Sequence, residues 1–160
     1  MRATLRVARV PTLAVTLLSV AWLATPSGGQ PAGIDGLWLS DDGRGAVRIA
    51  PCGENACGHI AWLRDKTRLD GGPLVDIHNP DPKQRSRAIC GLQVIGALTR
   101  QVDGSWDQGW IYDPKVGKTY DVAVTAKDGH TLAVHGYLQT RFLGKTYYWS
   151  RAPEGLQRCR

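Results

Sequence analysis

The chain has 160 residues, and its twenty Lys and Arg against fourteen Asp and Glu give a formal net charge of +6. This length corresponds to one ordinary domain. The basic residues are scattered and form none of the dense runs typical of a nucleic-acid-binding arm, so we expect no nucleic-acid partner.

Residues 1–29 have the pattern of a secretory signal peptide. Three arginines precede an apolar run at 10–24, small and turn-forming residues follow it, and no acid occurs before Asp35. A basic start, a short apolar middle and a small-residue exit are the three parts of a cleaved export signal. We therefore expect a periplasmic or secreted protein.

The apolar run is about 15 residues long, whereas a helix needs about 20 to span a bilayer. We predict that the leader is removed after Ser27 or Gly29 and that no stable membrane span remains. The alternatives are an uncleaved anchor and an Arg-rich organellar transit peptide. The mature part is a single domain at 34–160, with a formal charge of +3 because the leader carries three basic residues and no acid.

Beyond the leader the chain shows short alternating segments separated by turn signals, and it shows no convincing helix. Such segments, bounded by Gly, Pro, Asn and Asp, are typical of consecutive antiparallel strands. Closing eight of them removes the exposed edges of a flat sheet, so we predict an all-β, eight-stranded antiparallel up-and-down barrel. The predicted strands are 37–40, 46–50, 58–63, 92–99, 106–112, 119–126, 131–138 and 145–151.

One connection, between the third and fourth predicted strands, is much longer than the others. Residues 64–90 contain three prolines, two adjacent glycines and many charges. A long connection inside a compact domain is usually functional or disordered, and the apolar Val75 and Ile77 among polar neighbours favour an ordered lid. Asn79 as N-cap and Pro80 as first residue predict a short helical turn there.

The alternation also indicates which side chains point inward. Tyr120, Val122 and Val124 share one face of their predicted strand, because successive side chains of a strand alternate between its faces. We expect such faces to line the barrel. An eight-stranded barrel is either packed with side chains or holds one small ligand, and the alternation leaves both possibilities open.

All four cysteines, Cys52, Cys57, Cys90 and Cys159, lie in the mature chain. An even number in a small exported domain indicates disulfides, here with three possible pairings. We favour Cys52–Cys57, which would clip a tight hairpin, together with Cys90–Cys159, which would tie the tail to mid-chain. A zinc site of Cys52, Cys57 and His59 is the alternative, but the spacing suits a hairpin better. We expect no metal and no cofactor.

The start of the first predicted strand, Gly36-Leu37-Trp38, resembles the opening of a lipocalin. In lipocalins the Trp closes one end of the barrel beneath an Arg from the last strand. Arg151, two residues after Trp149, matches that Arg in position. A guanidinium above an indole ring contributes ~0.5–2 kcal/mol.

A longer resemblance extends over residues 36–151. The segments GLW, DIHNPDP, RSRAICGL, GWIYDPKVGKTY and YYWSR resemble, in this order, domain-of-unknown-function family 2147, a group of secreted bacterial proteins. The resemblance implies a lipocalin-like fold and an envelope location, and ligand binding only by analogy with lipocalins. The matching positions are Trp38, Asp76, Asn79, Pro80, Gly91, Gly109, Tyr112, Pro114, Gly117, Tyr120, Gly136, Trp149 and Arg151.

The predicted ligand site contains Asp76, Asn79, Arg87, Tyr112 and Tyr120. The two tyrosines lie near the ends of one predicted hairpin, where their hydroxyls would face the barrel mouth. Asp76 and Asn79, together with Arg87 or its neighbour Arg85, would close over the opening and hold an anionic group, which Arg binds in a bidentate way.

These patterns predict a lipocalin-like envelope protein that binds a small-molecule or lipid-like, partly apolar ligand. One alternative is an envelope interaction module with a packed barrel and with Trp106, Trp110 and Tyr112 on its surface. Another is a hydrolase that uses Asp76 or His78. The chain has no Gly-x-Ser-x-Gly, His-Glu-x-x-His or phosphate-binding loop, so we do not expect an enzyme. The pattern leaves the oligomeric state open.

Overall fold

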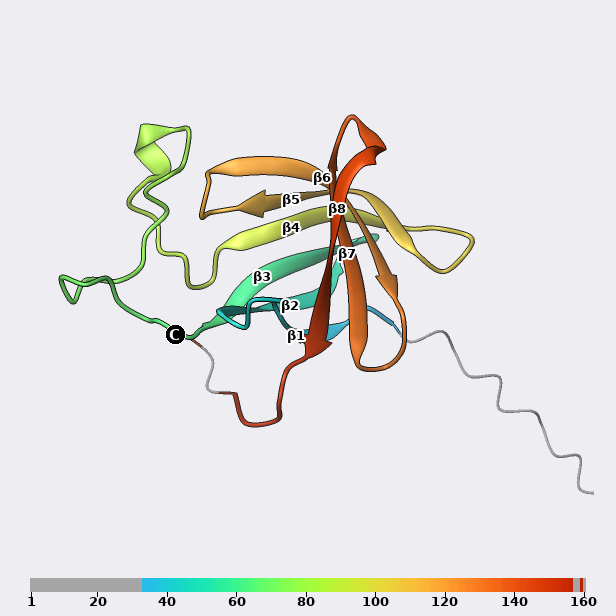
Figure 1. Cartoon of the computed structure of the whole chain (residues 1–160), viewed down its shortest axis with the longest axis horizontal. Helices are drawn as coiled ribbons and strands as arrows, with labels where there is room; N and C mark the ends of the chain where they lie inside the picture. Colours follow the sequence, from blue (N-terminus) through green and yellow to red (C-terminus); the bar gives the residue numbers. More distant parts are fainter. Residues whose placement is uncertain (1–32, 157–158, 160) are drawn as a thin grey trace, which may run out of the picture.

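The computed structural model describes residues 33–156 and 159, which contain a closed barrel of eight antiparallel strands (Figure 1). Each strand pairs with the next along the chain, and β8 pairs with β1. This confirms the predicted up-and-down barrel. The strands are β1 (Gly36–Leu39), β2 (Gly45–Cys52), β3 (Asn55–Leu63), β4 (Gln93–Arg100), β5 (Trp106–Asp113), β6 (Lys118–Ala126), β7 (Thr131–Leu138) and β8 (Thr140–Arg151).

The predicted export signal lies outside the described residues. Within residues 33–156 and 159, no helix combines the length and the apolar character needed to cross a membrane.

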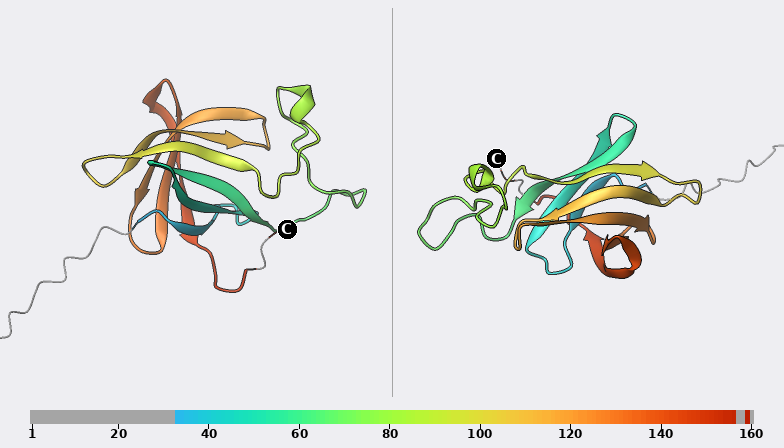
Figure 2. Two further views of the ribbon diagram at one scale, coloured as in Figure 1. Left: turned by 180° about the vertical axis from the view of Figure 1, so that it is seen from behind. Right: turned by 90° about the horizontal axis from the view of Figure 1, so that it is seen from above.

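The main difference from the predicted strands is the start of β8, at Thr140 rather than Lys145. Residues 140–144, the part that was not predicted, are all exposed and show no alternation of buried and exposed side chains. The strand forms because its main chain pairs with β7 up to the hairpin, where Leu138 lies opposite Thr140. Figure 2 shows this first part of β8 strongly curled at one side of the barrel.

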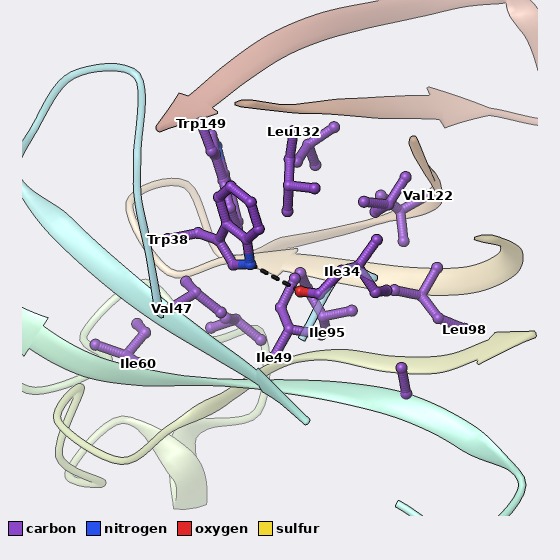
Figure 3. Packing of buried hydrophobic residues seen from close by; sticks show 14 of the residues in the cluster. Ile34, Trp38, Val47, Ile49, Ile60, Ile95, Leu98, Val122, Leu132 and Trp149 are labelled. Atoms are coloured by element: carbon purple, nitrogen blue, oxygen red, sulfur yellow. Dashed lines mark hydrogen bonds between the residues drawn. The ribbon is translucent and has the colours of Figure 1, made fainter. Parts of the chain in front are cut away.

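The core fills the end of the barrel at which the chain enters and leaves. Trp38 is fully buried there, and its indole N–H donates to the carbonyl oxygen of Ile34 at 2.7 Å (Figure 3). Ile49, Leu132 and Val124 from three other strands are buried in the same cluster. Their inward positions follow from strand alternation.

Arg151 closes this end from outside the core, as the lipocalin resemblance implies. Its guanidinium carbon lies 3.8 Å from the centre of the Trp38 ring, and its Nη1 donates to the carbonyl oxygen of Asp35 at 2.8 Å. Gly36 makes this arrangement possible: its φ is +132°, and a Cβ there would lie 2.0 Å from Arg151 Nη1. The Gly-x-Trp pattern therefore reflects the room that the arginine needs.

The connection between β3 and β4 is ordered by its own turns. It contains one short 3-10 helix, η1 (Pro82–Gln84), whose N-cap is Asp81: the Asp81 carboxylate accepts from the Lys83 N–H. The prediction of a turn capped by Asn79 and begun at Pro80 is wrong by two residues. The Asn79 side chain divides its contacts: its Nδ2 donates to Asp76 and Tyr112 inside the fold, and its Oδ1 accepts from the Asp81 N–H.

Two disulfides join Cys52 to Cys57 and Cys90 to Cys159, the pairing favoured from the sequence. The first links the two strands of the β2–β3 hairpin, and it excludes the alternative zinc site because both thiols are used. The second ties the C-terminal segment to the end of the β3–β4 connection. Two disulfides are compatible with an extracytoplasmic protein.

Candidate functional site

The barrel holds a cavity of about 870 Å³ that is open to solvent at the end away from Trp38. The β1–β2 turn, the β5–β6 turn and the β3–β4 connection surround the opening. Ligand pockets typically measure ~300–1,000 Å³, so the cavity has the size of a small-molecule site. Its apolar wall includes Val47, Ile60, Val94, Ile111, Val134 and Trp149.

The strand register explains why these side chains face the cavity. Directly opposite residues of neighbouring strands lie on the same face of a sheet. Val134 is opposite Val124 on β6 and opposite Tyr147 on β8. Because Val124 is fully buried in the core, Val134 and Tyr147 also point inward.

Gly136 leaves part of the cavity wall empty. It follows Val134 by two residues on β7 and so shares its inward face. A Cβ at this position would meet no atom closer than the Cγ2 of Ile111, at 3.9 Å. A larger side chain at Gly136 would therefore project into the cavity without striking the backbone.

The opening continues along β8, because the barrel is barely closed there. β1 has four residues and pairs with β8 only at Trp38–Arg151 and Leu39–Ser150. Between these pairs and the hairpin tip, no described strand other than β7 pairs with β8. The cavity lining accordingly includes the β1–β2 turn on one side and Leu143, Gly144, Lys145 and Tyr147 on the other.

Four of the five predicted site residues meet in one cluster beside the opening. Asp76 is fully buried, and its carboxylate accepts from the Tyr112 hydroxyl at 2.7 Å and from the Asn79 amide at 2.8 Å. Arg87 Nε donates to Asp76 Oδ2 at 2.9 Å, and Arg87 Nη2 lies 2.8 Å from the same oxygen. The Arg87 guanidinium carbon also lies 5.4 Å from the centre of the Tyr112 ring.

These contacts shift the pKa of both acidic groups in the cluster. Burial raises the pKa of Asp76, but the hydrogen bonds from Asn79, Tyr112 and Arg87 outweigh it, and the net pKa lies below the ordinary 3.8. Burial, and then the neighbouring Asp76 carboxylate, raise the pKa of Tyr112 above 10.0. At neutral pH the cluster is therefore an Asp carboxylate held by a neutral phenol, an amide and a guanidinium.

The cluster fastens the β3–β4 connection to the barrel, since Tyr112 belongs to β5 whereas the other three belong to the connection. The connection is also closed on itself: the N–H of Asp76 donates to the Arg87 carbonyl at 3.0 Å. Figure 1 shows it beside the turn between β5 and β6. A Cβ at Gly117 in this turn, where φ is +67°, would lie 1.8 Å from the carbonyl oxygen of His78.

The predicted site residues thus fall into two groups. Tyr112 and Tyr120 both line the cavity. Asp76, Asn79 and Arg87 lie behind Tyr112 and do not line it. Tyr120 lies apart from the cluster, on β6 opposite Ile111.

Sequence reasoning missed Lys145 and Tyr147, which line the cavity from β8. A signal was present, because Lys145 and Tyr147 alternate with the buried Trp149 along β8. A lysine at an inward-facing strand position is easily taken for a solvent-facing residue, and both Lys145 and Tyr147 are exposed at the open side of the barrel.

The aromatic residues offered for a surface module are only partly exposed. Tyr112 is buried, and Trp106 and Trp110 are half-buried and pack against the core. Trp110 lies close over Gly96, where a Cβ would come within 2.5 Å of the indole ring.

Comparison with known proteins gives a family and a fold. The family model described as an uncharacterised protein conserved in bacteria (DUF2147) matches residues 36–151. No curated protein matches the chain. A solved structure, protein HP1028 from Helicobacter pylori, described as belonging to the lipocalin family, has 22% identity and a TM-score of 0.69. The match covers 81% of this chain and 92% of that one, and it shows a lipocalin-like fold.

Proposed function

Because the chain belongs to DUF2147 and folds as a lipocalin-like barrel, we propose that it is an exported binding protein of the bacterial envelope. It holds a small, partly apolar ligand in the barrel cavity. The observation that carries this proposal is the open cavity of about 870 Å³ with its apolar wall. Binding would bury apolar ligand surface, which stabilises a complex by ~25 cal/mol per Å² before the costs of association.

Two features support the envelope location. The leader at 1–29 has the three parts of an export signal. Both disulfides join cysteines of the mature part, residues 34–160, and disulfides persist in oxidising compartments such as the periplasm.

The β3–β4 connection serves as a lid in this proposal. Its residues Leu74, Ile77 and His78 line the mouth of the cavity. The Asp76 cluster, which includes the Tyr112 hydroxyl, holds the lid in place. Tyr120 lines the cavity outside this cluster, and its hydroxyl would orient the polar end of the ligand.

The cavity favours this function over an interaction module, which requires a packed interior. The burial of Tyr112 also removes one of the three rings from the proposed module surface. For a hydrolase, Asp76 is poorly suited, because its carboxylate is buried and already accepts three side-chain hydrogen bonds.

A test compares the oxidised protein with a variant whose cavity is filled. Mass spectrometry of a lipid extract from the purified protein, followed by displacement of a fluorescent fatty acid, reports occupancy. We expect displacement by apolar ligands from the natural protein and at least tenfold weaker binding by Gly136→Leu, whose side chain enters the cavity.

The matched control is Gly129→Leu. Gly129 lies in the β6–β7 turn, away from the mouth, and a Cβ added there would have no atom within 4 Å. This variant adds the same side chain and should bind like the natural protein. No bound species in the extract and no displacement by any probe would contradict the proposal.

A further inference from the structure

Three cationic residues, Arg44, Lys115 and Lys145, line the cavity, and of these only Lys145 lies within a strand. It lies opposite Gly136 in the β7–β8 pairing and two residues before Tyr147, which is opposite the buried Val134. Lys145 therefore occupies an inward-facing strand position. The glycine opposite leaves room beside it.

The Lys145 ammonium has no acidic partner among the described residues; it lies 4.8 Å from the centre of the Tyr147 ring. The acids that line the mouth lie on turns, in the connection or at a strand end, and they are Asp41, Asp42, Asp65 and Asp113. Two of them are already engaged. Asp42 pairs with Lys115, and Asp113 accepts from the Lys115 main-chain N–H.

The cavity changes in polarity along β8. Lys145, Tyr147 and the Tyr120 phenol are near the opening, whereas Trp149 lies deeper beside the core. From Leu143 to Trp149 the strand covers about 20 Å at ~3.3 Å per residue. An occupant that matches this wall is long, apolar at one end and negatively charged at the other.

We infer that the ligand is a single-chain amphiphile with an anionic head, and that the Lys145 ammonium binds the head. The chain lies along β8 towards Trp149, where it buries apolar surface. This inference rests on the proposed function, but it adds a ligand class and a residue that decides between ligands. A hydrogen bond to a charged group distinguishes an anion from an uncharged head of the same chain length.

Three probes with the same chain test the inference: dodecanoate, dodecanol and dodecylammonium, each kept below its micelle concentration. The full chain is expressed with its own leader and purified in oxidised form, and calorimetry measures the dissociation constants. We expect dodecanoate to bind about tenfold more tightly than dodecanol and dodecylammonium to bind most weakly.

Lys145→Met keeps an apolar stem and removes the charge, so it should bind dodecanoate about as weakly as dodecanol. Lys145→Gln should give the same loss and replaces the methionine variant if that one folds poorly. Lys118→Met is the matched control, because Lys118 is exposed on β6, does not line the cavity, and its loss changes the net charge equally. It should keep the preference for dodecanoate.

The outcomes separate the two proposals. If none of the three probes binds the natural protein, the proposed function fails and this inference fails with it. If dodecanol binds as tightly as dodecanoate, or if Lys145→Met keeps the preference, the inference about Lys145 is overturned while the binding function stands.

Discussion

Asp76 is a carboxylate that has lost all contact with water, which is costly unless its oxygens are hydrogen-bonded. Tyr112, Asn79 and Arg87 supply those hydrogen bonds. The contribution of the cluster to the free energy of unfolding therefore depends on the charge of Asp76. A substitution that keeps the shape of Asp76 but removes its charge isolates this effect.

We expect Asp76→Asn to lower the free energy of unfolding by about 1–3 kcal/mol at neutral pH, because Arg87 loses its anionic partner and an amide replaces an acceptor. The native pKa of Asp76 lies below the ordinary 3.8. The charge therefore stabilises the fold above pH 3.8, and this contribution is lost as pH falls through the lower native value. Urea unfolding should show the two proteins converging in acid.

Asp70→Asn is the control for this series. Asp70 pairs with Arg68 in an exposed ion pair, and such pairs contribute little to stability. We expect it to leave unfolding at neutral pH unchanged. A difference between Asp76→Asn and the natural protein that persists unchanged into strong acid would mean that the charge of Asp76 is not what stabilises the cluster.

At this scale the sequence identified the residues but not their partners. Asp76, Asn79, Arg87 and Tyr112 were predicted to face a ligand, yet these four residues form one hydrogen-bonded cluster, and of the four only Tyr112 also lines the cavity. Tyr112 is 36 residues from Asp76. A polar group that binds a ligand and one that binds a distant side chain give the same local pattern.

Two structural elements, the β5–β6 hairpin and the β3–β4 connection, meet at Gly117. Gly117→Ala should destabilise the protein by more than the ~1–2 kcal/mol that a left-handed conformation costs a side chain, because the added Cβ would strike the carbonyl of His78. The connection must then move. Urea unfolding and native-state hydrogen exchange at Asn79, whose N–H donates to Asp76, measure both effects.

Gly104→Ala provides the comparison, since Gly104 has φ +84° and no atom within 4 Å of a Cβ. It carries the conformational cost alone and should leave exchange at Asn79 unchanged. Equal destabilisation by the two alanine variants would show that contact with His78 contributes nothing.

The strands were predictable because alternation and turn chemistry agree at most of them. Asp103-Gly104 and Asp128-Gly129 mark reversals that the structure has, between β4 and β5 and between β6 and β7. The start of β8 was not predictable, because main-chain pairing with β7 creates it without burying side chains. The short helix was misplaced because Asn79 and Asp81 are both favoured N-cap residues. Asp81 is the N-cap in the structure, whereas the Asn79 amide nitrogen donates to Asp76.

For the whole molecule, closure of the barrel explains why the cavity opens at the side as well as the end. β1 and β8 are joined by two residue pairs, and the contact of Arg151 with the Trp38 ring adds to the closure of the barrel between these strands. A hollow interior could not be predicted from alternation, because packed and hollow barrels have the same inward pattern. The hollow interior depends on two features that only the structure reveals: the vacant space at Gly136 and the short β1.

The two disulfides should contribute unequally to stability, because the entropy lost by the unfolded chain grows with the length of the closed loop. Cys90 and Cys159 are 69 residues apart, whereas Cys52 and Cys57 are five apart. The chain-entropy relation gives roughly 4 kcal/mol for the long loop and roughly 2 kcal/mol for the short one. Urea unfolding of Cys90→Ser/Cys159→Ser and of Cys52→Ser/Cys57→Ser measures these contributions.

The long loop also has a native-state role that the short one lacks. Cys90 ends the β3–β4 connection, and the N–H of Cys159 donates to the Ala61 carbonyl on β3 at 2.9 Å, so the bond holds the end of the connection and the C-terminal segment against one strand. Loss of the Cys90–Cys159 bond should therefore speed hydrogen exchange in the connection, whereas loss of Cys52–Cys57 should leave exchange there unchanged. Equal losses of unfolding free energy and equal exchange rates in the two double variants would show that neither loop length nor this attachment governs the stability of the barrel.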